Sequence, residues 1–462
     1  MLAIAAPGTT RASVDHAAGQ HGMRFPIDPS SGAFCSVGGM VATNASGARS
    51  LKFGSTRRWV TGLECIFADG SRTWVRRGAD LDCRNEALAR FADNSARFQE
   101  RAAEQPTPAV RKNSSGLGLS AFARSGELID LLCGSEGTLC AFSGVELALA
   151  EVPESTASLL ASWSSLDDAV RGAALAREAG ASACELLDRT FVRIVAEHGD
   201  RALPVDVNAD TVLLIEMESP APASGTTHGH DESARRSLEA GVAALKRALY
   251  AAGASQVLVG LDPESEESLW AIRHAASPIL ARLDPAIASM QVIEDGAVPP
   301  SHLAEYVRGV RGALVSAGFR GVIFGHAGDA NVHVNVLVDV REPAWRERLA
   351  RLFGDVTELT ARLGGTPTGE HGDGRLRTPV LERFWSAAAL DLIRDIKATL
   401  DPRGILNPGV KTPAPADFDV WHAIKYDPGL ATVPAKARLV LDRVERERAY
   451  DRSRLEMLAA AL

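Results

Sequence analysis

The N-terminal third of the chain combines amphipathic segments with short apolar runs and turns. Residues 10–22 carry apolar side chains at helical spacing and end on a glycine, which predicts a helix with a glycine stop. Residues 28–76 alternate short apolar runs with turns, and the pair Asp69-Gly70 is typical of a hairpin. We therefore expect a meander of strands over 28–76, followed by a charged helix over 86–103.

From Pro153 onward, apolar runs and amphipathic segments alternate. The pattern predicts strands at 157–163, 181–188, 210–219 and 256–262, and helices at 166–180 and 231–253. This β–α–β, β–α–β alternation indicates a ferredoxin-like α+β unit. Further helices are expected at 268–283, 300–318 and 341–365, with a strand, a turn and a second strand over 321–339.

The patterns divide the chain into three segments and favour an α+β fold. Residues 1–152 form the first, 153–411 the second, and 412–462 a helix-rich, heavily charged tail in which no residue suggests chemistry. A length of 462 residues suits two or three domains.

Composition excludes several classes of protein. The net charge of −8 argues against nucleic acid as a partner, which would require a basic surface. The six cysteines include no CxxC pair, so the spacings of zinc ribbons, iron–sulfur domains and thioredoxins are absent, and a reduced cytoplasmic protein is expected. No apolar run has the length of a transmembrane helix, and the first residues do not resemble a signal peptide.

Two glycine-framed clusters carry the strongest chemical signal. GHAGDANVH (325–333) supplies His326 and His333, and GEHGDG (369–374) supplies Glu370 and His371. Two imidazoles and a carboxylate suit a divalent metal with an open coordination position. A base beside a ligand, as His371 is beside Glu370, could act on a metal-bound group. Scattered loop histidines are the alternative, which two such clusters close together in sequence disfavour.

A second glycine-rich run covers residues 35–70, with glycines at 38, 39, 47 and 54. Closely spaced glycines let backbone N–H groups approach a phosphate or a flat ring. Neither the GxGxxG spacing of a Rossmann unit nor the GK[ST] of a Walker loop is present. The residues alone therefore indicate a small-molecule cradle, or a glycine-rich meander without a ligand.

Four blocks of sequence resemble the FAD-linked oxidase family of the vanillyl-alcohol-oxidase type, on its D-lactate, glycolate and D-2-hydroxyglutarate dehydrogenase branch. They are APGTTRASVDHAAGQHGMRFPIDPSS (6–31), SVGGMVATNASG (36–47), GSEGTLCAF (134–142), and the series GHAGDANVH, GEHGDGRL and DPRGILNPG ending at Gly409. The resemblance implies a PCMH-type FAD-binding domain followed by a ferredoxin-like cap domain for the substrate. It also implies a flavin-dependent dehydrogenase that oxidises a D-2-hydroxy acid to the 2-oxo acid.

The resemblance also implies roles for individual residues. His326, His333 and Glu370 would bind zinc or another divalent metal, and His371 would be the catalytic base. Arg273 would bind the substrate carboxylate, with Ser277 nearby. The residues matched to the FAD site are Pro29, Gly38, Gly39, Asn44, Gly47, Gly54, Ser135, Glu136, Gly137 and Asn407.

Family members carry a further α/β subdomain before the 6–31 block, with a glycine-rich loop for the FAD pyrophosphate, and no such loop occurs here. We therefore expect a chain truncated at its N-terminus that binds FAD weakly by itself. Two alternatives stay open: a zinc-dependent hydrolase, and a catalytically incomplete fragment that needs a separate FAD-binding piece. An iron–sulfur protein, a quinone or an electron-transfer flavoprotein could accept the electrons, and the protein could lie peripherally at the inner membrane.

Overall fold

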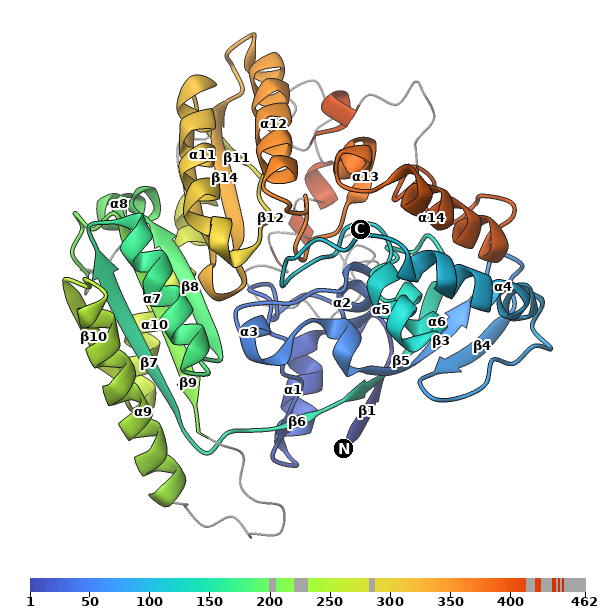
Figure 1. Ribbon diagram of the computed structural model, residues 1–462, viewed down its shortest axis with the longest axis horizontal. Coiled ribbons are helices and arrows are strands. Elements are labelled where there is room, and N and C mark those ends of the chain that lie inside the picture. Colours follow the sequence, from blue (N-terminus) through green and yellow to red (C-terminus); the bar gives the residue numbers. More distant parts are fainter. Residues whose placement is uncertain are drawn as a thin grey trace.

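The computed structural model describes residues 1–198, 205–219, 232–281, 287–412, 420–424, 434–437, 439–440 and 443. Figure 1 shows the two larger sheets side by side, each covered by helices; β2 (Met23–Arg24) and β6 (Ala150–Glu151) form a third, two-stranded sheet. The fold class is mixed α and β, as the sequence predicts. Within the described part, no helix combines the length and the apolar character that crossing a membrane requires.

The first sheet is antiparallel, with the order β1-β5-β3-β4. Its strands are β1 (Leu2–Ala5), β5 (Ala141–Ala148), β3 (Val60–Ile66) and β4 (Arg72–Arg76). The predicted hairpin joins β3 to β4, and its turn closes with a hydrogen bond from the Phe67 amide to the Ser71 carbonyl. Thr10 caps the predicted first helix, α1 (Arg11–Gly19), with its side chain.

The meander expected over 28–76 is wrong in its first half. Two helices occupy it, α2 (Val37–Thr43) and α3 (Ser50–Phe53). The Ser36 side chain caps α2 by accepting a hydrogen bond from the Gly39 amide, and Asn44 ends α2 in the left-handed conformation. These local caps outweigh the low helix propensity of two adjacent glycines, which had favoured turns.

Helices from distant parts of the sequence share the core behind the first sheet. They are α4 (Glu86–Ala103), α5 (Leu119–Ser125), α6 (Leu128–Leu132) and α14 (Ala387–Leu400). Figure 1 shows α14 lying beside α4. Trp385 and Leu392 are buried in the same cluster as Phe91 and Phe122. We call the first sheet with its helices the first unit, and the second sheet with its helices the second unit. The chain therefore returns to the first unit after it has formed the second.

The second sheet has the order β10-β7-β9-β8-β13-β14-β11, with β12 also paired to β14. Its strands are β7 (Thr156–Trp163), β8 (Ala183–Asp188), β9 (Thr211–Glu218), β10 (Gln256–Gly260), β11 (Ile287–Met290), β12 (Gly296–Ala297), β13 (Arg320–His326) and β14 (Asn331–Asp339). β7, β8, β9 and β10, with one helix after β7 and one after β9, have the strand order of the predicted ferredoxin-like unit.

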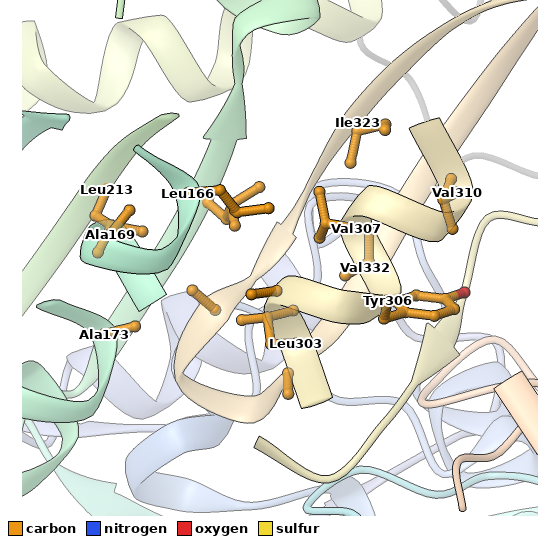
Figure 2. Close-up of a cluster of buried hydrophobic side chains, with 14 of the residues drawn as sticks. Leu166, Ala169, Ala173, Leu213, Leu303, Tyr306, Val307, Val310, Ile323 and Val332 are labelled. Carbon is orange, nitrogen blue, oxygen red and sulfur yellow. The ribbon is translucent and has the colours of Figure 1, made fainter. Parts of the chain in front are cut away.

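Helices cover both faces of this sheet, because alternate residues of each strand point to opposite faces. On β9, Leu213 and Ile215 pack with α7 (Leu166–Glu178), α9 (Glu232–Ala251), α11 (Leu303–Ser316) and α12 (Trp345–Arg362). Val212 and Leu214 pack on the other face, towards α8 (Arg189–His198) and α10 (Pro263–Ala281). Figure 2 shows side chains of α7 and α11 meeting above the sheet.

The β13–β14 hairpin carries both histidines of the first glycine-framed cluster. A short 3-10 turn, Ala327–Asp329, joins the strands, as the sequence predicts. His333 pairs across the hairpin with Phe324, and His326 lies two residues beyond Phe324, so both imidazoles share one face. Gly325 has φ 154°, and a Cβ there would clash with the carbonyl oxygen of Asn331.

Replacing Gly325 with Ala should lower the free energy of unfolding by about 1–3 kcal/mol, because the new methyl group meets backbone atoms that cannot move aside. The matched control is Gly354→Ala, on the exposed side of α12, where a Cβ meets nothing within 4 Å. That change should raise stability by about 0.5–1 kcal/mol through helix propensity. Urea unfolding measures both, and an unchanged midpoint for Gly325→Ala would contradict the clash.

Candidate functional site

A cavity of about 1070 Å³ lies between the glycine-rich segment and the second sheet; we call it the central cavity. Residues of the first unit and of the second line it together. It brings together eight residues that the sequence analysis singled out: Pro29, Gly39, Gly47, Arg273, His326, His333, Glu370 and His371. The two glycine-framed clusters and the glycine-rich run thus face one space.

Three of these residues form a compact cluster, which we call the His–His–Glu cluster. Nε2 of His326 lies 3.1 Å from Nε2 of His333 and 3.1 Å from Oε1 of Glu370. Nε2 of His333 lies 3.3 Å from the same carboxylate oxygen. All three side chains are buried. Four-coordinate zinc holds its ligand atoms at roughly 2.0–2.2 Å, which places neighbouring ligands about 3.3 Å apart.

The hydrogen bonds on the far side of the two imidazoles are consistent with a metal-binding role for the His–His–Glu cluster. Nδ1 of His326 donates to Oε1 of Glu185 at 2.5 Å, and Nδ1 of His333 donates to the carbonyl oxygen of Glu294 at 2.8 Å. A neutral imidazole that donates from Nδ1 presents a lone pair at Nε2. Both lone pairs and the Glu370 carboxylate therefore converge, and this donor set fits a divalent cation.

The second oxygen of Glu370 is held by residues of the first unit. Oε2 accepts hydrogen bonds from the Ser46 hydroxyl at 2.6 Å and from Nζ of Lys112 at 2.9 Å. Lys112 also donates to the Gly47 carbonyl at 3.2 Å. The burial of Lys112 makes this ion pair weakly screened by solvent. Glu370 is therefore oriented from both sides, and its Oε1 is left for the histidines.

His371 lies at the edge of the His–His–Glu cluster with its ring stacked on that of His333. Its side chain is 44% exposed, and Nε2 lies 3.8 Å from Oε1 of Glu370. Nδ1 donates to Oε2 of Glu294 at 2.5 Å, and the other Glu294 oxygen accepts from Arg377 at 2.5 Å. The carboxylate thus fixes which nitrogen of His371 faces the cavity.

Asp295 supports the backbone of the loop that carries Glu370 and His371. Its Oδ2 accepts hydrogen bonds from the amides of Glu370 and His371, at 3.0 and 2.8 Å, and from the Thr368 hydroxyl at 2.5 Å. Its Oδ1 accepts from the Asn331 amide group at 3.1 Å. Three charge-assisted bonds to one oxygen hold the loop in position.

Neighbouring charges shift the protonation of these groups. Burial lowers the pKa of His326, but the Glu185 carboxylate outweighs it and raises the pKa to about 9. Burial lowers the pKa of His333, and the charge of His326 adds to this shift. Burial also opposes the charged form of His371, yet Asp295 and Glu294 raise its pKa to about 10. The pKa of Glu370 falls well below its usual value, against the effect of burial, because of Lys112 and His326.

Arg273 extends into the central cavity from α10. Its Nε donates to Oε2 of Glu185 at 2.9 Å, and its guanidinium carbon lies 4.6 Å above the ring centre of Phe324. The same carboxylate thus orients both Arg273 and His326. The guanidinium is held in place while it lines the cavity, which suits it to bind a carboxylate. The side chain of Ser277 lies outside the described residues.

The remaining residues matched to the FAD site do not line the central cavity. Asn44 and Gly54 line a second cavity, described below. Gly38 packs against Pro7, and its amide donates to the Pro7 carbonyl at 2.8 Å. The Ser135 side chain is fully buried.

Glu136, between Ser135 and Gly137, holds the loop that follows His371. Its carboxylate accepts from the amides of Asp373 and Gly374, at 2.7 and 2.9 Å, and pairs with Lys411 at 2.8 Å. Its carbonyl oxygen accepts from the Asn407 side chain at 2.6 Å. The contacts of Glu136 and Asn407 therefore support the loop that follows His371.

Several functional side chains carried only a weak sequence signal. Glu185 is a carboxylate within a fully buried strand, which is itself a sign of a specific partner. Glu294 and Asp295 lie outside the sequence blocks from which the candidate site residues were drawn. Lys112 and Ser46 become part of the site only through long-range packing, which a local pattern does not contain.

Family models match most of the chain. The model described as FAD linked oxidases, C-terminal domain, matches residues 152–410, and the model of an FAD binding domain matches residues 1–76.

Individual relatives are similar at lower identity. The glycolate oxidase subunit GlcD of Bacillus subtilis (strain 168) is 29% identical over 411 residues, which cover 88% of this chain and 75% of the relative. The D-lactate dehydrogenase of Archaeoglobus fulgidus is 28% identical, with coverage of 88% and 76%. The D-2-hydroxyglutarate dehydrogenase of Pantoea ananatis is 27% identical, and the match covers 84% of this chain but 39% of the relative.

Solved structures share the fold. The 4-ethylphenol oxidase from Gulosibacter chungangensis aligns with a TM-score of 0.61 at 15% identity, covering 90% of this chain and 77% of the oxidase. An alkyldihydroxyacetonephosphate synthase aligns with a TM-score of 0.57 at 14% identity, and the chain spans 64% of that structure's length. At these identities the likeness concerns the fold alone.

Metal-free protein should lose stability as the pH rises from 6.5 to 9. A histidine with a folded pKa near 9 and an unfolded pKa near 6.5 stabilises the fold below pH 6.5, and the contribution disappears as pH passes the folded pKa. A shift of this size corresponds to roughly 3 kcal/mol. Glu185→Gln should remove most of this loss, because it removes the charge that raises the pKa of His326.

Urea unfolding at several pH values measures the loss. Glu305→Gln is the control, since it removes a carboxylate beside the exposed His302 and should leave the pH dependence unchanged. Equal pH profiles for wild type and Glu185→Gln would show that the Glu185–His326 pair does not carry the effect.

Proposed function

Because the chain belongs to the family of FAD linked oxidases, we propose that this FAD-dependent oxidoreductase oxidises a D-2-hydroxy acid to the 2-oxo acid at the central cavity, with a divalent metal, zinc by preference, in the His–His–Glu cluster. Three relatives support the substrate class, since they are a glycolate oxidase subunit, a D-lactate dehydrogenase and a D-2-hydroxyglutarate dehydrogenase.

One observation carries the proposal. The glycine-rich wall of the first unit and the groups suited to a hydroxy acid line the same cavity. A 2-hydroxy acid offers a carboxylate and an adjacent hydroxyl. Arg273 is a fork-shaped cation suited to the carboxylate, and the His–His–Glu cluster with His371 is suited to the hydroxyl. A zinc hydrolase would use the cluster alone and would have no need of the glycine-rich wall.

The residues divide the work between binding and proton transfer. Arg273, fixed by Glu185, orients the substrate. His371 removes the hydroxyl proton at Nε2, while Glu294 holds the opposite side of its ring. A bound metal would supply Lewis-acid polarisation of the hydroxyl, and FAD would supply the acceptor for the hydride. Because its neighbouring carboxylates raise its pKa, His371 must release its own proton before it acts. The positive charge of a bound metal would favour this release, because a nearby like charge lowers the pKa of a histidine.

Anaerobic bleaching of the flavin tests the proposal. The purified protein is supplied with FAD and zinc, and D-lactate, glycolate and D-2-hydroxyglutarate are added in turn, with the L-enantiomers of the two chiral acids as controls. We expect at least one of the three acids to bleach the visible flavin band. If that acid is chiral, its D-form should bleach the band and its L-form should not. A protein that takes up zinc, stays colourless with FAD and cleaves ester substrates would favour the hydrolase. The electron acceptor, whether a quinone, an iron–sulfur protein or an electron-transfer flavoprotein, stays a prediction.

Replacing His333 with Ala should lower zinc affinity by at least about 100-fold and abolish turnover. The change removes one of three ligands and leaves two, which rarely retain the metal. Competition with a chromophoric chelator measures the affinity. His302→Ala, an exposed histidine away from the cavity, is the control and should bind zinc as wild type does. Full metal content and turnover in His333→Ala would exclude the proposed ligand set.

Replacing His371 with Asn should lower kcat by a factor of about 10²–10⁴, the usual contribution of a positioned base. Zinc and flavin content should stay near that of wild type, because Glu370 and not His371 belongs to the proposed ligand set. Steady-state kinetics with an artificial electron acceptor measure kcat, and metal analysis accompanies them. Loss of zinc together with recovery of kcat on zinc addition would show that the two neighbouring residues have exchanged roles.

A further inference from the structure

A second cavity of about 660 Å³ lies in the first unit, on the other side of the segment that contains Ser46; we call it the basic cavity. Six cationic side chains line it, against one carboxylate, that of Asp130. The cations are Arg57, Arg58, Arg77, Arg111, Lys112 and Arg124. Such a surplus contrasts with the net charge of −8 for the whole chain.

Three of the six cations already have carboxylate partners. Arg77 pairs with Asp130 at 2.7 Å and with Glu127 at 2.8 Å. Arg111 pairs with Asp329 at 3.0 Å, and Lys112 with Glu370 at 2.9 Å. These pairs neutralise half of the positive charge and form the fixed part of the wall.

The other three cations have no carboxylate partner among the described residues. Arg57 donates from Nε to the Asp130 carbonyl at 3.1 Å and from Nη2 to the Cys133 carbonyl at 2.6 Å. Burial lowers the pKa of Arg57, and the charges of Arg77 and Arg124 act in the same direction. Arg58 and Arg124 are exposed at the cavity wall. Gathering three uncompensated guanidinium groups costs free energy unless an anion offsets their repulsion.

We propose that the basic cavity binds a small phosphate-bearing anion other than FAD, at a site separate from the substrate. Asn44 and Gly54, which the resemblance matched to FAD, would then line the site of this anion instead. Guanidinium groups donate in pairs to phosphate oxygens, and the three cations that have no carboxylate partner match the charge of a diphosphate group. Hydroxyl groups of Ser55 and Ser120 and the Asn113 amide line the same wall and can donate to further oxygens. A cavity of this volume is within the range of small-molecule sites and too small for a folded partner.

Lys112 and Ser46 line the basic cavity as well as contacting Glu370. The basic cavity and the His–His–Glu cluster therefore share a wall, although the chemistry of the central cavity requires nothing from Arg58 or Arg124. These two arginines are suitable for substitution, since neither belongs to the catalytic machinery and both are exposed.

Isothermal titration with inorganic pyrophosphate, with FAD present in excess, tests the proposal. Wild-type protein should bind one pyrophosphate with a dissociation constant below the millimolar range. The double variant Arg58→Ala/Arg124→Ala should bind it at least about tenfold more weakly, because two charge-assisted contacts are lost. The control variant Arg235→Ala/Arg236→Ala removes two exposed charges from α9 and should bind as wild type does. Sodium chloride at equal ionic strength corrects for screening.

Three results would overturn the proposal. Equal affinity in wild type and Arg58→Ala/Arg124→Ala would place the anion elsewhere. Succinate binding as tightly as pyrophosphate would show a general anion surface instead of a phosphate site. Release of bound flavin by pyrophosphate, followed by flavin fluorescence, would show that the cavity serves the phosphates of FAD itself. None of these readouts depends on the proposed oxidation, so the two proposals fail separately.

Discussion

Two imidazole nitrogens that both present lone pairs cannot lie 3.1 Å apart unless positive charge lies on or between them. The site depends on this constraint. Glu185 and the Glu294 carbonyl hold the Nδ1 atoms of His326 and His333 as donors, so each neutral ring must direct its lone pair inward. In the metal-free protein a proton on His326 removes the repulsion, and the Glu185 carboxylate favours this proton because it raises the pKa of His326 to about 9. A divalent cation would remove the repulsion more completely, because it could bind both nitrogens and the Glu370 carboxylate together.

The division of Glu370 between its two oxygens couples the cluster to the first unit. Oε1 faces the histidines of the second sheet, and Oε2 is bound by Ser46 and Lys112 of the first unit. Arg49 adds a second connection, with paired hydrogen bonds to Glu216 on β9 and a bond to Asp28 beside the glycine-rich run. Movement of one unit against the other would therefore disturb the cluster and the central cavity together.

Local patterns predicted the parts of the fold that depend on local forces. The β13–β14 hairpin follows from its alternating residues and its glycine turn, and the ferredoxin-like unit follows from the sequence of apolar runs. The segment 37–53 was mispredicted because the cap supplied by Ser36 outweighs the glycines. In the site, His326, His333, Glu370 and His371 carried signals in their glycine frames. Glu185 and Lys112 did not, since their roles arise only when β8 and the 107–113 loop are brought against the cluster by tertiary packing.

Glu294 and Asp295 show how environment assigns different tasks to adjacent carboxylates. Oδ2 of Asp295 already accepts from two backbone amides and the Thr368 hydroxyl, so it can do little beyond fixing the loop. One carboxylate oxygen of Glu294 accepts a hydrogen bond from Arg377, and the other accepts one from His371. The charges of His371 and Arg377 lower the pKa of Glu294 to about 2, against the effect of burial. The partner of His371 thus stays ionised across the physiological range. Its bond keeps Nδ1 protonated, so any proton that His371 exchanges with a substrate must pass through Nε2, on the side of the central cavity.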